Sequence, residues 1–427
     1  MEDFSTRFAF DDDAPTDANI RVIGCGGGGG NAVNNMLAKG IHGVEFTAVN
    51  TDAQALQVNL APLKIQIGRE RTSGLGAGAR PSVGAEAAQE SHKEIEAALQ
   101  GCDMVFVTAG MGGGTGTGAA PVIAAIAKEM GILTVAVVTK PFVCEGKKRL
   151  RMAEQGIQNL RDTVDTLVIV PNERLLDIAE DDTTLVDAFV MADDVLYNAV
   201  RGISELITVH GLINLDFADV RTTMLDGGTA LMGSAIASGD KRAERAAREA
   251  LESPLLDGIS IDGARNVLVN ITAGPSLSIR EATHGMSVIQ QQAGDEAEVI
   301  FGTVIDPEMG DHLRVTVMAT GFDANQGAPE EAPEVIQRSI PLNLDHHVSP
   351  HYKGETNLRD LDKPAYERRS RVAPPSEKSR EVEESPSAVP LKNVKRLRIS
   401  ELPAEPGERI KKGGDPDVPA FLRRMMD

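Results

Sequence analysis

The sequence predicts an α/β fold. A Rossmann-like parallel-sheet domain comes first, then a long central helix, a smaller α+β domain and a disordered tail. Three observations lead to this prediction. Short β-branched runs alternate with helical spacing, the runs are almost continuously apolar, and glycine-rich loops follow two of them. Strands without alternating polarity are typical of a parallel sheet that helices cover on both faces.

The first domain is expected over residues 20–182. Its predicted strands are Ile20–Ile23, Val44–Val49, Lys64–Ile67, Asp103–Thr108, Ile132–Val138 and Thr166–Val170. Helical spacing lies between them at Asn31–Lys39, Ser82–Leu99 and Pro121–Met130. Ligands of such sheets bind beyond the carboxyl ends of the strands, and both glycine-rich loops fall there.

A single long helix is predicted over residues 183–209, about 40 Å at 1.5 Å per residue, and it could join two domains. Residues 210–322 are expected to form the α+β domain. Its predicted helices are Lys241–Leu251 and Ser278–Gln292, and its predicted strands are Asn266–Thr272, Glu298–Val304 and Leu313–Ala319.

Both ends of the chain lack the pattern of a folded domain. Residues 1–19 are acidic and polar, without the features of a signal peptide, and are expected to be disordered. Residues 323–414 are rich in Pro, Glu, Ser, Arg and Lys and read as a disordered linker. Residues 415–427 regain apolar spacing beside two arginines, which favours a peptide that folds on binding a partner over a frayed tail.

The composition excludes several classes of protein. A net charge of −20 disfavours binding to nucleic acid and to anionic lipid. No apolar run approaches the ~20 residues of a membrane span. Three cysteines without C-x-x-C spacing are expected to be reduced, as in the cytosol. No metal site made of protein ligands is predicted, because the histidines of the linker lack matching ligands.

The first glycine-rich loop has G-x-G-x-x-G spacing at Gly24, Gly26 and Gly29, between a strand and a helix. Glycine lets the backbone approach an anion, and a helix N-terminus supplies free N–H groups. Alone, the motif leaves a flexible turn and a dinucleotide site open. The second of these gains support from Asp52, which falls where a ribose-binding acid would lie.

The second loop, Gly112–Gly118, is another strand-to-helix cradle and carries two threonines. A nicotinamide site would not need it, whereas two loops could surround a di- or triphosphate from both sides. The chain contains no G-x-x-x-x-G-K-[ST] motif, so it is not a P-loop enzyme.

The third motif, Asn214–Asp219, follows the long helix. Asp216 and Asp219 are three residues apart and would share one face of a helical turn. Paired carboxylates can polarise water or hold Mg²⁺. A helix N-cap with an acidic first turn explains the same spacing.

Five segments, in this order and spacing, resemble bacterial members of the tubulin/FtsZ family: Gly24–Asn31, Gly74–Gly78, Gly112–Gly118, Pro141–Arg149 and Gly211–Val220. The resemblance covers about residues 20–322, and the final peptide also matches. It implies a cytoplasmic GTPase that polymerises head to tail into the cell-division ring at midcell, beneath the inner membrane. GTP and GDP would be substrate and product, and Mg²⁺ would bind through the phosphates.

The resemblance also implies roles for particular positions. Those expected around the phosphates are Gly27, Gly28, Gly29, Gly30, Asn31, Ala77, Gly78, Gly114, Thr115 and Gly116. Glu145 and Arg149 would reach the ribose and phosphate region, and Asn172 would lie near the nucleoside. Phe189 would stack on guanine and Asp193 would accept from its N–H groups, which favours GTP over ATP.

In this family Asn214, Asp216 and Asp219 would act on the GTP of the adjacent subunit and position the attacking water. Self-assembly would therefore activate the GTPase. Division adaptors and regulators would bind Asp417–Asp427, without nucleic acid and without direct membrane insertion. The chain departs from the family at Cys144, usually an apolar or aromatic residue, and at Arg80, usually Asn.

Two other functions are alternatives to this one. A dinucleotide-dependent oxidoreductase would use Gly24–Gly29, but no residue pair for hydride transfer is evident. A tubulin-like scaffold would hold GTP without hydrolysing it, which the intact Asp216 and Asp219 argue against.

Overall fold

The computed structural model describes residues 18–322, except residues 181, 210, 214 and 257–260. The expectations for the linker, the final peptide, Asn214 and nearly all of the N-terminal segment therefore lie outside the described residues.

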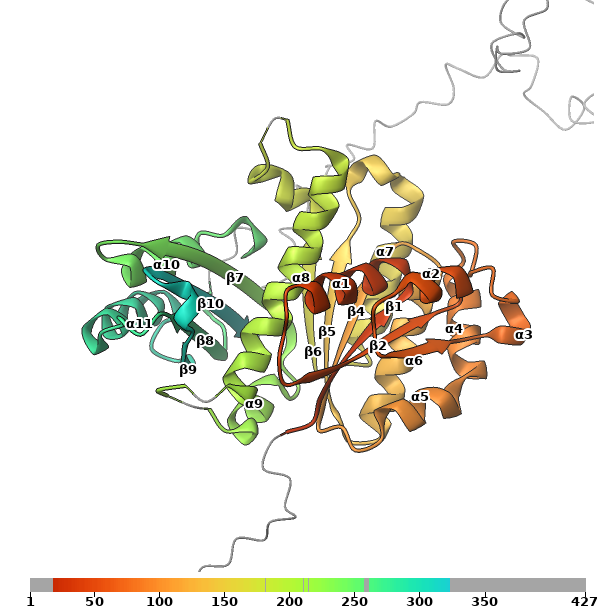
Figure 1. Ribbon diagram of the computed structural model, residues 1–427, viewed down its shortest axis with the longest axis horizontal. Helices are drawn as coiled ribbons and strands as arrows, with labels where there is room; N and C mark the ends of the chain where they lie inside the picture. Colours follow the sequence, from red (N-terminus) through yellow and green to blue (C-terminus); the bar gives the residue numbers. More distant parts are fainter. Residues whose placement is uncertain (1–17, 181, 210, 214, 257–260, 323–427) are drawn as a thin grey trace, which may run out of the picture. The chain divides into compact units, whose positions relative to one another are not determined.

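A parallel sheet forms the first part of the described chain (Figure 1). Its strands are β1 (Ile20–Cys25), β2 (Val44–Asn50), β3 (Leu63–Gln66), β4 (Met104–Gly110), β5 (Leu133–Lys140) and β6 (Thr166–Pro171). The spatial order is β3-β2-β1-β4-β5-β6, and every neighbouring pair is parallel. This order is that of a doubly wound nucleotide-binding sheet, so the predicted fold class is confirmed.

Helices cover both faces of this sheet. They are α1 (Gly26–Ala38), α2 (Ala53–Val58), α3 (Arg69–Thr72), α4 (Pro81–Glu90), α5 (His92–Leu99), α6 (Thr115–Glu129) and α7 (Lys147–Arg161), with 3₁₀ turns η1 (Val143–Glu145) and η2 (Asn172–Asp177). Alternate residues of one strand enter different cores: Val105 and Val107 face α4 to α7, whereas Met104 and Phe106 face α1. Both faces are buried, which explains why the strands are continuously apolar.

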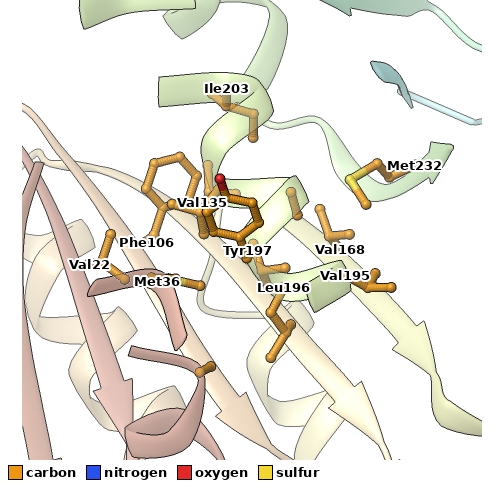
Figure 2. Packing of buried hydrophobic residues seen from close by; sticks show 14 of the residues in the cluster. Val22, Met36, Phe106, Val135, Val168, Val195, Leu196, Tyr197, Ile203 and Met232 are labelled. Atoms are coloured by element: carbon orange, nitrogen blue, oxygen red, sulfur yellow. The ribbon is translucent and has the colours of Figure 1, made fainter. Parts of the chain in front are cut away.

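The predicted central helix is α8 (Leu185–Thr208), 24 residues and about 36 Å long. Thr184 caps it: its side chain accepts from the Asp187 N–H, and the Asp187 carboxylate accepts from the Thr184 N–H. Figure 2 shows Leu196 and Tyr197 of α8 packed among Phe106 and Val135 of the sheet, inside one buried cluster.

The smaller domain continues the same sheet. Its strands are β7 (Gly228–Ser238), β8 (Asn266–Ala273), β9 (Glu298–Ile305) and β10 (His312–Thr320), and its helices are α9 (Phe217–Met224), α10 (Arg242–Leu251) and α11 (Ile279–Ala293), with 3₁₀ turns η3 (Pro254–Leu256) and η4 (Pro307–Met309). β7 pairs in parallel with β6 over three residues and antiparallel with β10 along most of its length. β10 pairs antiparallel with β8, and β8 pairs parallel with β9. A separate apolar core lies under α10 and α11.

Several elements differ from the sequence prediction. The helix expected from Asn31 begins at Gly26, so the glycines form its first turns instead of a flexible turn. The single helix expected over Ser82–Leu99 is two helices, because Ser91 ends α4 and its carbonyl accepts from the N–H groups that open α5. α2, α3, α7 and β7 were not predicted.

Candidate functional site

A cavity of about 460 Å³ lies at the carboxyl ends of the parallel strands. Gly110 ends β4 and Thr139 lies near the end of β5, and both line it. The predicted site residues that line the cavity are Gly27, Gly28, Asn31, Gly114, Thr115, Gly116, Glu145, Arg149, Asn172, Phe189 and Asp193. Residues more than 160 positions apart in the chain are thus brought into one wall.

The two glycine loops meet backbone to backbone at one end of this cavity. A Cβ on Gly26, which has φ +72°, would lie 2.8 Å from the amide nitrogen of Gly116. A Cβ on Gly116 would lie 2.9 Å from the carbonyl oxygen of Gly110. Only glycine permits this approach, and it lets the N-termini of α1 and α6 converge. Their unpaired N–H groups and dipoles favour an anion there.

The two threonines of the second loop hold it in shape. Thr115 Oγ1 lies 2.7 Å from Thr51 Oγ1 in a buried hydrogen bond, and Thr117 Oγ1 accepts from the Gly112 N–H at 2.8 Å. Thr117 is buried and does not line the cavity. The cradle for an anion is therefore mainly backbone.

The other end of the cavity is formed by α8. Phe189, Ala192, Asp193 and Leu196 follow helical spacing and lie on one face. The buried Phe142 ring meets Phe189 edge-on, with centroids 5.4 Å apart and planes at 83°. This contact fixes the Phe189 ring while leaving the residue 40% exposed, so an aromatic ligand can stack on it.

Asp193 has an unusual environment for a carboxyl group. Burial raises its pKa to about 7, and the charge of the neighbouring Asp194 adds to the effect. Near neutral pH it is therefore present in both protonation states. The ionised form is a hydrogen-bond acceptor only, which suits a ligand that offers two N–H donors.

Asn172 provides an unsatisfied acceptor. The residue is only 3% exposed, and its side-chain Oδ1 has no hydrogen-bond partner among the described residues. An unpaired buried carbonyl costs about 1–3 kcal/mol. A ligand N–H or O–H in the cavity would remove this cost.

Glu145 and Arg149 close one side of the cavity. The Glu145 Oε1 accepts from the Phe142 N–H at 2.9 Å, and its other oxygen pairs with the Arg149 guanidinium. Glu145 is thereby fixed, whereas the Arg149 side chain stays half exposed at the rim. A cation at this position can approach an anionic ligand.

Four predicted site residues do not line the cavity: Gly29, Gly30, Ala77 and Gly78. A Cβ on Gly29 would lie 2.4 Å from the Thr108 carbonyl oxygen, so this glycine permits α1 to pack on β4. The Gly30 carbonyl accepts from the Asn59 side chain at 2.9 Å. Ala77 is buried under Gly114, and Gly78 has φ +58° in the exposed loop beyond it.

Gly113 and Pro141 also line the cavity and fall within segments that the sequence analysis singled out, although neither was named as a site residue. Five further residues that line it were not singled out: Gly110, Met111, Thr139, Ala192 and Leu196. The sequence held a signal for some of them. Gly110 and Thr139 fall at the ends of predicted strands, and Ala192 and Leu196 complete an i, i+3, i+4, i+7 pattern with Phe189 and Asp193.

The two acids of the third motif lie elsewhere. Asp216 and Asp219 are exposed at the start of α9, beyond the C-terminal end of α8 (Figure 1). From Asp193 to Thr208 the helix axis spans roughly 22 Å. Asp216 occupies the N-cap position, but within the described part of the chain its carboxylate makes no capping hydrogen bond. Asp216 at the N-cap and Asp219 in the first turn nevertheless occupy the positions that the capping interpretation expects.

The described residues contain no group of three His, Cys, Asp or Glu side chains that could enclose a metal ion. In the same residues no helix combines the length and the apolar character that crossing a membrane requires.

Known proteins match both parts of this architecture. Residues 19–180 match the model of the Tubulin/FtsZ family, GTPase domain, and residues 228–323 match that of the FtsZ family, C-terminal domain. A protein of Azotobacter vinelandii named Cell division protein FtsZ is 50% identical over 420 residues, which is 98% of this chain and 100% of that protein. Its namesake from Coxiella burnetii is 47% identical over 98% of this chain and 99% of its own length.

A solved structure is also similar. The empty FtsZ dimer from M. jannaschii has a TM-score of 0.70 and 47% identity, and the match covers 72% of this chain and 89% of that chain.

Proposed function

The chain belongs to the tubulin/FtsZ family, and from this premise we propose that it hydrolyses GTP in a site that the next copy of the chain completes within a head-to-tail filament. It is a cell division protein of the FtsZ type with a tubulin-like GTPase domain. Assembly, the shared site and the role of each residue are the proposal.

One observation carries the proposal. The nucleotide cavity and the exposed carboxylates of Asp216 and Asp219 lie at opposite ends of α8. A single chain cannot bring these groups together without breaking that helix. Stacked copies in one direction would bring the acids of one subunit to the phosphates of the next, which is a heterologous, open-ended contact. The dimer reported for the M. jannaschii relative supports self-association.

Within one subunit, the chain would bind and orient GTP. The N-termini of α1 and α6 would hold the phosphates through backbone N–H groups. Phe189 would stack on the base, Asp193 would accept from guanine N–H groups, and the Asn172 Oδ1 would accept a hydrogen bond from the nucleoside. The Arg149 guanidinium would offset phosphate charge at the rim.

The adjacent subunit would supply the chemistry. Its Asp216 and Asp219 would orient a water and take up its proton as the oxygen attacks the γ-phosphorus. The bond from that phosphorus to the bridging oxygen breaks, which leaves GDP and inorganic phosphate. Asn214, outside the described residues, would help to place the water. Any Mg²⁺ would enter with the phosphates, where it would neutralise their charge.

The cellular role follows from assembly. Filaments would form the cytokinetic ring at midcell beneath the inner membrane, and the amphipathic segment Asp417–Asp427 would bind division adaptors.

Complementation between two inactive variants tests the shared site. Asp216→Ala keeps the nucleotide cavity, and the double variant Phe189→Ala/Asp193→Ala keeps the acids. Each is expected to be inactive alone. Mixed in equal amounts, they are expected to regain up to about a quarter of the wild-type rate. In a random mixture, about one subunit contact in four joins the unmutated cavity of one variant to the unmutated acids of the other.

The control mixes Asp216→Ala with Asp219→Ala, and it should stay inactive because neither supplies an intact acid pair. If the first mixture also stays inactive although Asp216→Ala binds GTP, the shared site is wrong.

A further inference from the structure

Two helices contribute to the two ends of the nucleotide cavity. α1 presents its N-terminus to the phosphate end, and α8 presents Phe189 and Asp193 to the base end. These helices pack against each other within one buried cluster (Figure 2). The distance between the phosphate and base ends therefore depends on how α1 is held against α8.

Asp194 makes the polar contacts between the two helices. Its Oδ1 accepts from the Asn35 side-chain amide at 2.8 Å and pairs with the Lys39 ammonium. Asn35 and Lys39 lie one turn apart at the C-terminal end of α1. A single carboxylate of α8 is thus joined to two donors on the other helix.

Lys39 is itself held in place. Its ammonium lies 5.0 Å from the centre of the Tyr197 ring, one turn beyond Asp194 on α8. The Tyr197 hydroxyl accepts from Arg201 at 2.8 Å, and Tyr197 is buried. The aromatic face and the carboxylate together fix the position of the lysine.

Asp194 is also the neighbour of Asp193, which points into the cavity. We propose that Asp194 is a positioning residue for the nucleotide, because it fixes the base-reading face of α8 against the helix whose N-terminus faces the phosphates. This inference rests on the proposed binding of GTP in the cavity. It assigns no contact between Asp194 and the nucleotide.

The charge of Asp194 gives this role a signature in pH. The pKa of Asp193 is raised by burial and, secondarily, by Asp194. The charged groups around the pair include Lys39 at the end of α1 and, across the cavity, the paired Glu145 and Arg149. Glu249 of α10 and Glu252 just after it line a second cavity together with Asp194, and both variants leave these two carboxylates in place. The ionised Asp193 can accept from both guanine N–H groups, whereas the protonated form carries an O–H donor that meets one of them, so GTP affinity should fall as pH drops through about 7.

Two variants separate positioning from a general loss of structure. Asp194→Asn and Lys39→Met both remove the ion pair, and each should weaken GTP binding at pH 8 roughly two- to fivefold, the range for an exposed pair. In each variant we compare the midpoint, which is the pH at which the fall in GTP affinity is half complete. The midpoints of the two variants should move in opposite directions. Removing Asp194 removes a like charge and lowers the midpoint, whereas removing Lys39 leaves Asp194 uncompensated and raises it.

The experiment is titration of the full chain with a fluorescent GTP analogue between about pH 6 and 8, at a protein concentration below assembly. Glu244→Gln, which removes an ion pair to Arg248 in α10, serves as the matched control and should match the wild type. Midpoints that do not move, or move the same way in both variants, overturn the inference. A wild type that does not bind the analogue overturns the proposed function instead.

Discussion

The side-chain oxygen of Asn172 is a buried hydrogen-bond acceptor that a ligand could satisfy. Its Oδ1 lacks a partner among the described residues while the side chain is almost fully buried in the cavity wall. Folding leaves this acceptor unpaired, and a nucleoside donor would satisfy it. The position came from family resemblance; nothing in the local sequence distinguishes it from an ordinary residue after a strand.

Asn172→Ala is therefore expected to weaken GTP binding about fivefold, the value of one lost hydrogen bond. The free energy of unfolding of the nucleotide-free protein should not fall, because no bond to Oδ1 is lost and an unpaired buried acceptor is removed. Calorimetric titration and urea unfolding measure the two quantities. A large loss of stability with unchanged affinity would show that this amide serves the fold.

Some residues of the site could be predicted from the sequence and others could not. The glycine loops and the acids stood out by composition and spacing. Of the two threonines in the second loop, only the predicted Thr115 lines the cavity, while the Thr117 hydroxyl accepts from the Gly112 N–H inside the loop. Ala192 and Leu196 could have been found from Phe189 and Asp193 by helical spacing alone.

At the scale of elements, the two glycine loops depend on the close approach of α1 and α6. Gly26 combines φ +72° with a Cβ position 2.8 Å from the Gly116 nitrogen. Gly27 has neither constraint, since nothing among the described atoms lies within 4 Å of its Cβ position. Gly27 can therefore serve as the control position for a substitution at Gly26.

Gly26→Ala is expected to lower the free energy of unfolding by about 1–3 kcal/mol, from backbone strain and the clash together. Gly27→Ala should change it by only a few tenths. Urea unfolding of both variants without nucleotide checks this. Equal losses in the two would mean that the loops tolerate a wider separation than they have here.

Two elements that the sequence prediction missed, β7 and α7, differ in the signal that they carry. β7 is rich in small residues, and a Cβ on Gly233 would lie 2.0 Å from the Ala250 carbonyl oxygen, so α10 packs directly on the strand. α7 begins with charged residues and buries a narrow face that includes Gly156. In β7, close packing through glycine and alanine leaves little hydrophobic periodicity to detect. In α7 the buried Ala153, Ile157 and Leu160 do follow helical spacing, so the sequence held a signal for this helix.

On the scale of the whole molecule, α8 separates the nucleotide cavity from the two acids that the proposed hydrolysis needs. The base end of the nucleotide cavity uses its first turns, and the exposed acids follow its last turn. A rigid helix of about 36 Å keeps them apart within one chain. The sequence predicted the long helix, and the family resemblance implied that the acids act on an adjacent subunit, while the link between α1 and α8 through Asp194 needed the structure.

The most direct test of the account is the rate of GTP hydrolysis per molecule, with Mg²⁺, as protein concentration rises. The shared site predicts a threshold concentration above which the rate per molecule rises, because a catalytic site is complete only between assembled subunits. Asp216→Ala should remove the rise while GTP still binds. A rate per molecule that is constant at every concentration and insensitive to Asp216 would contradict the account, since each chain would then act alone.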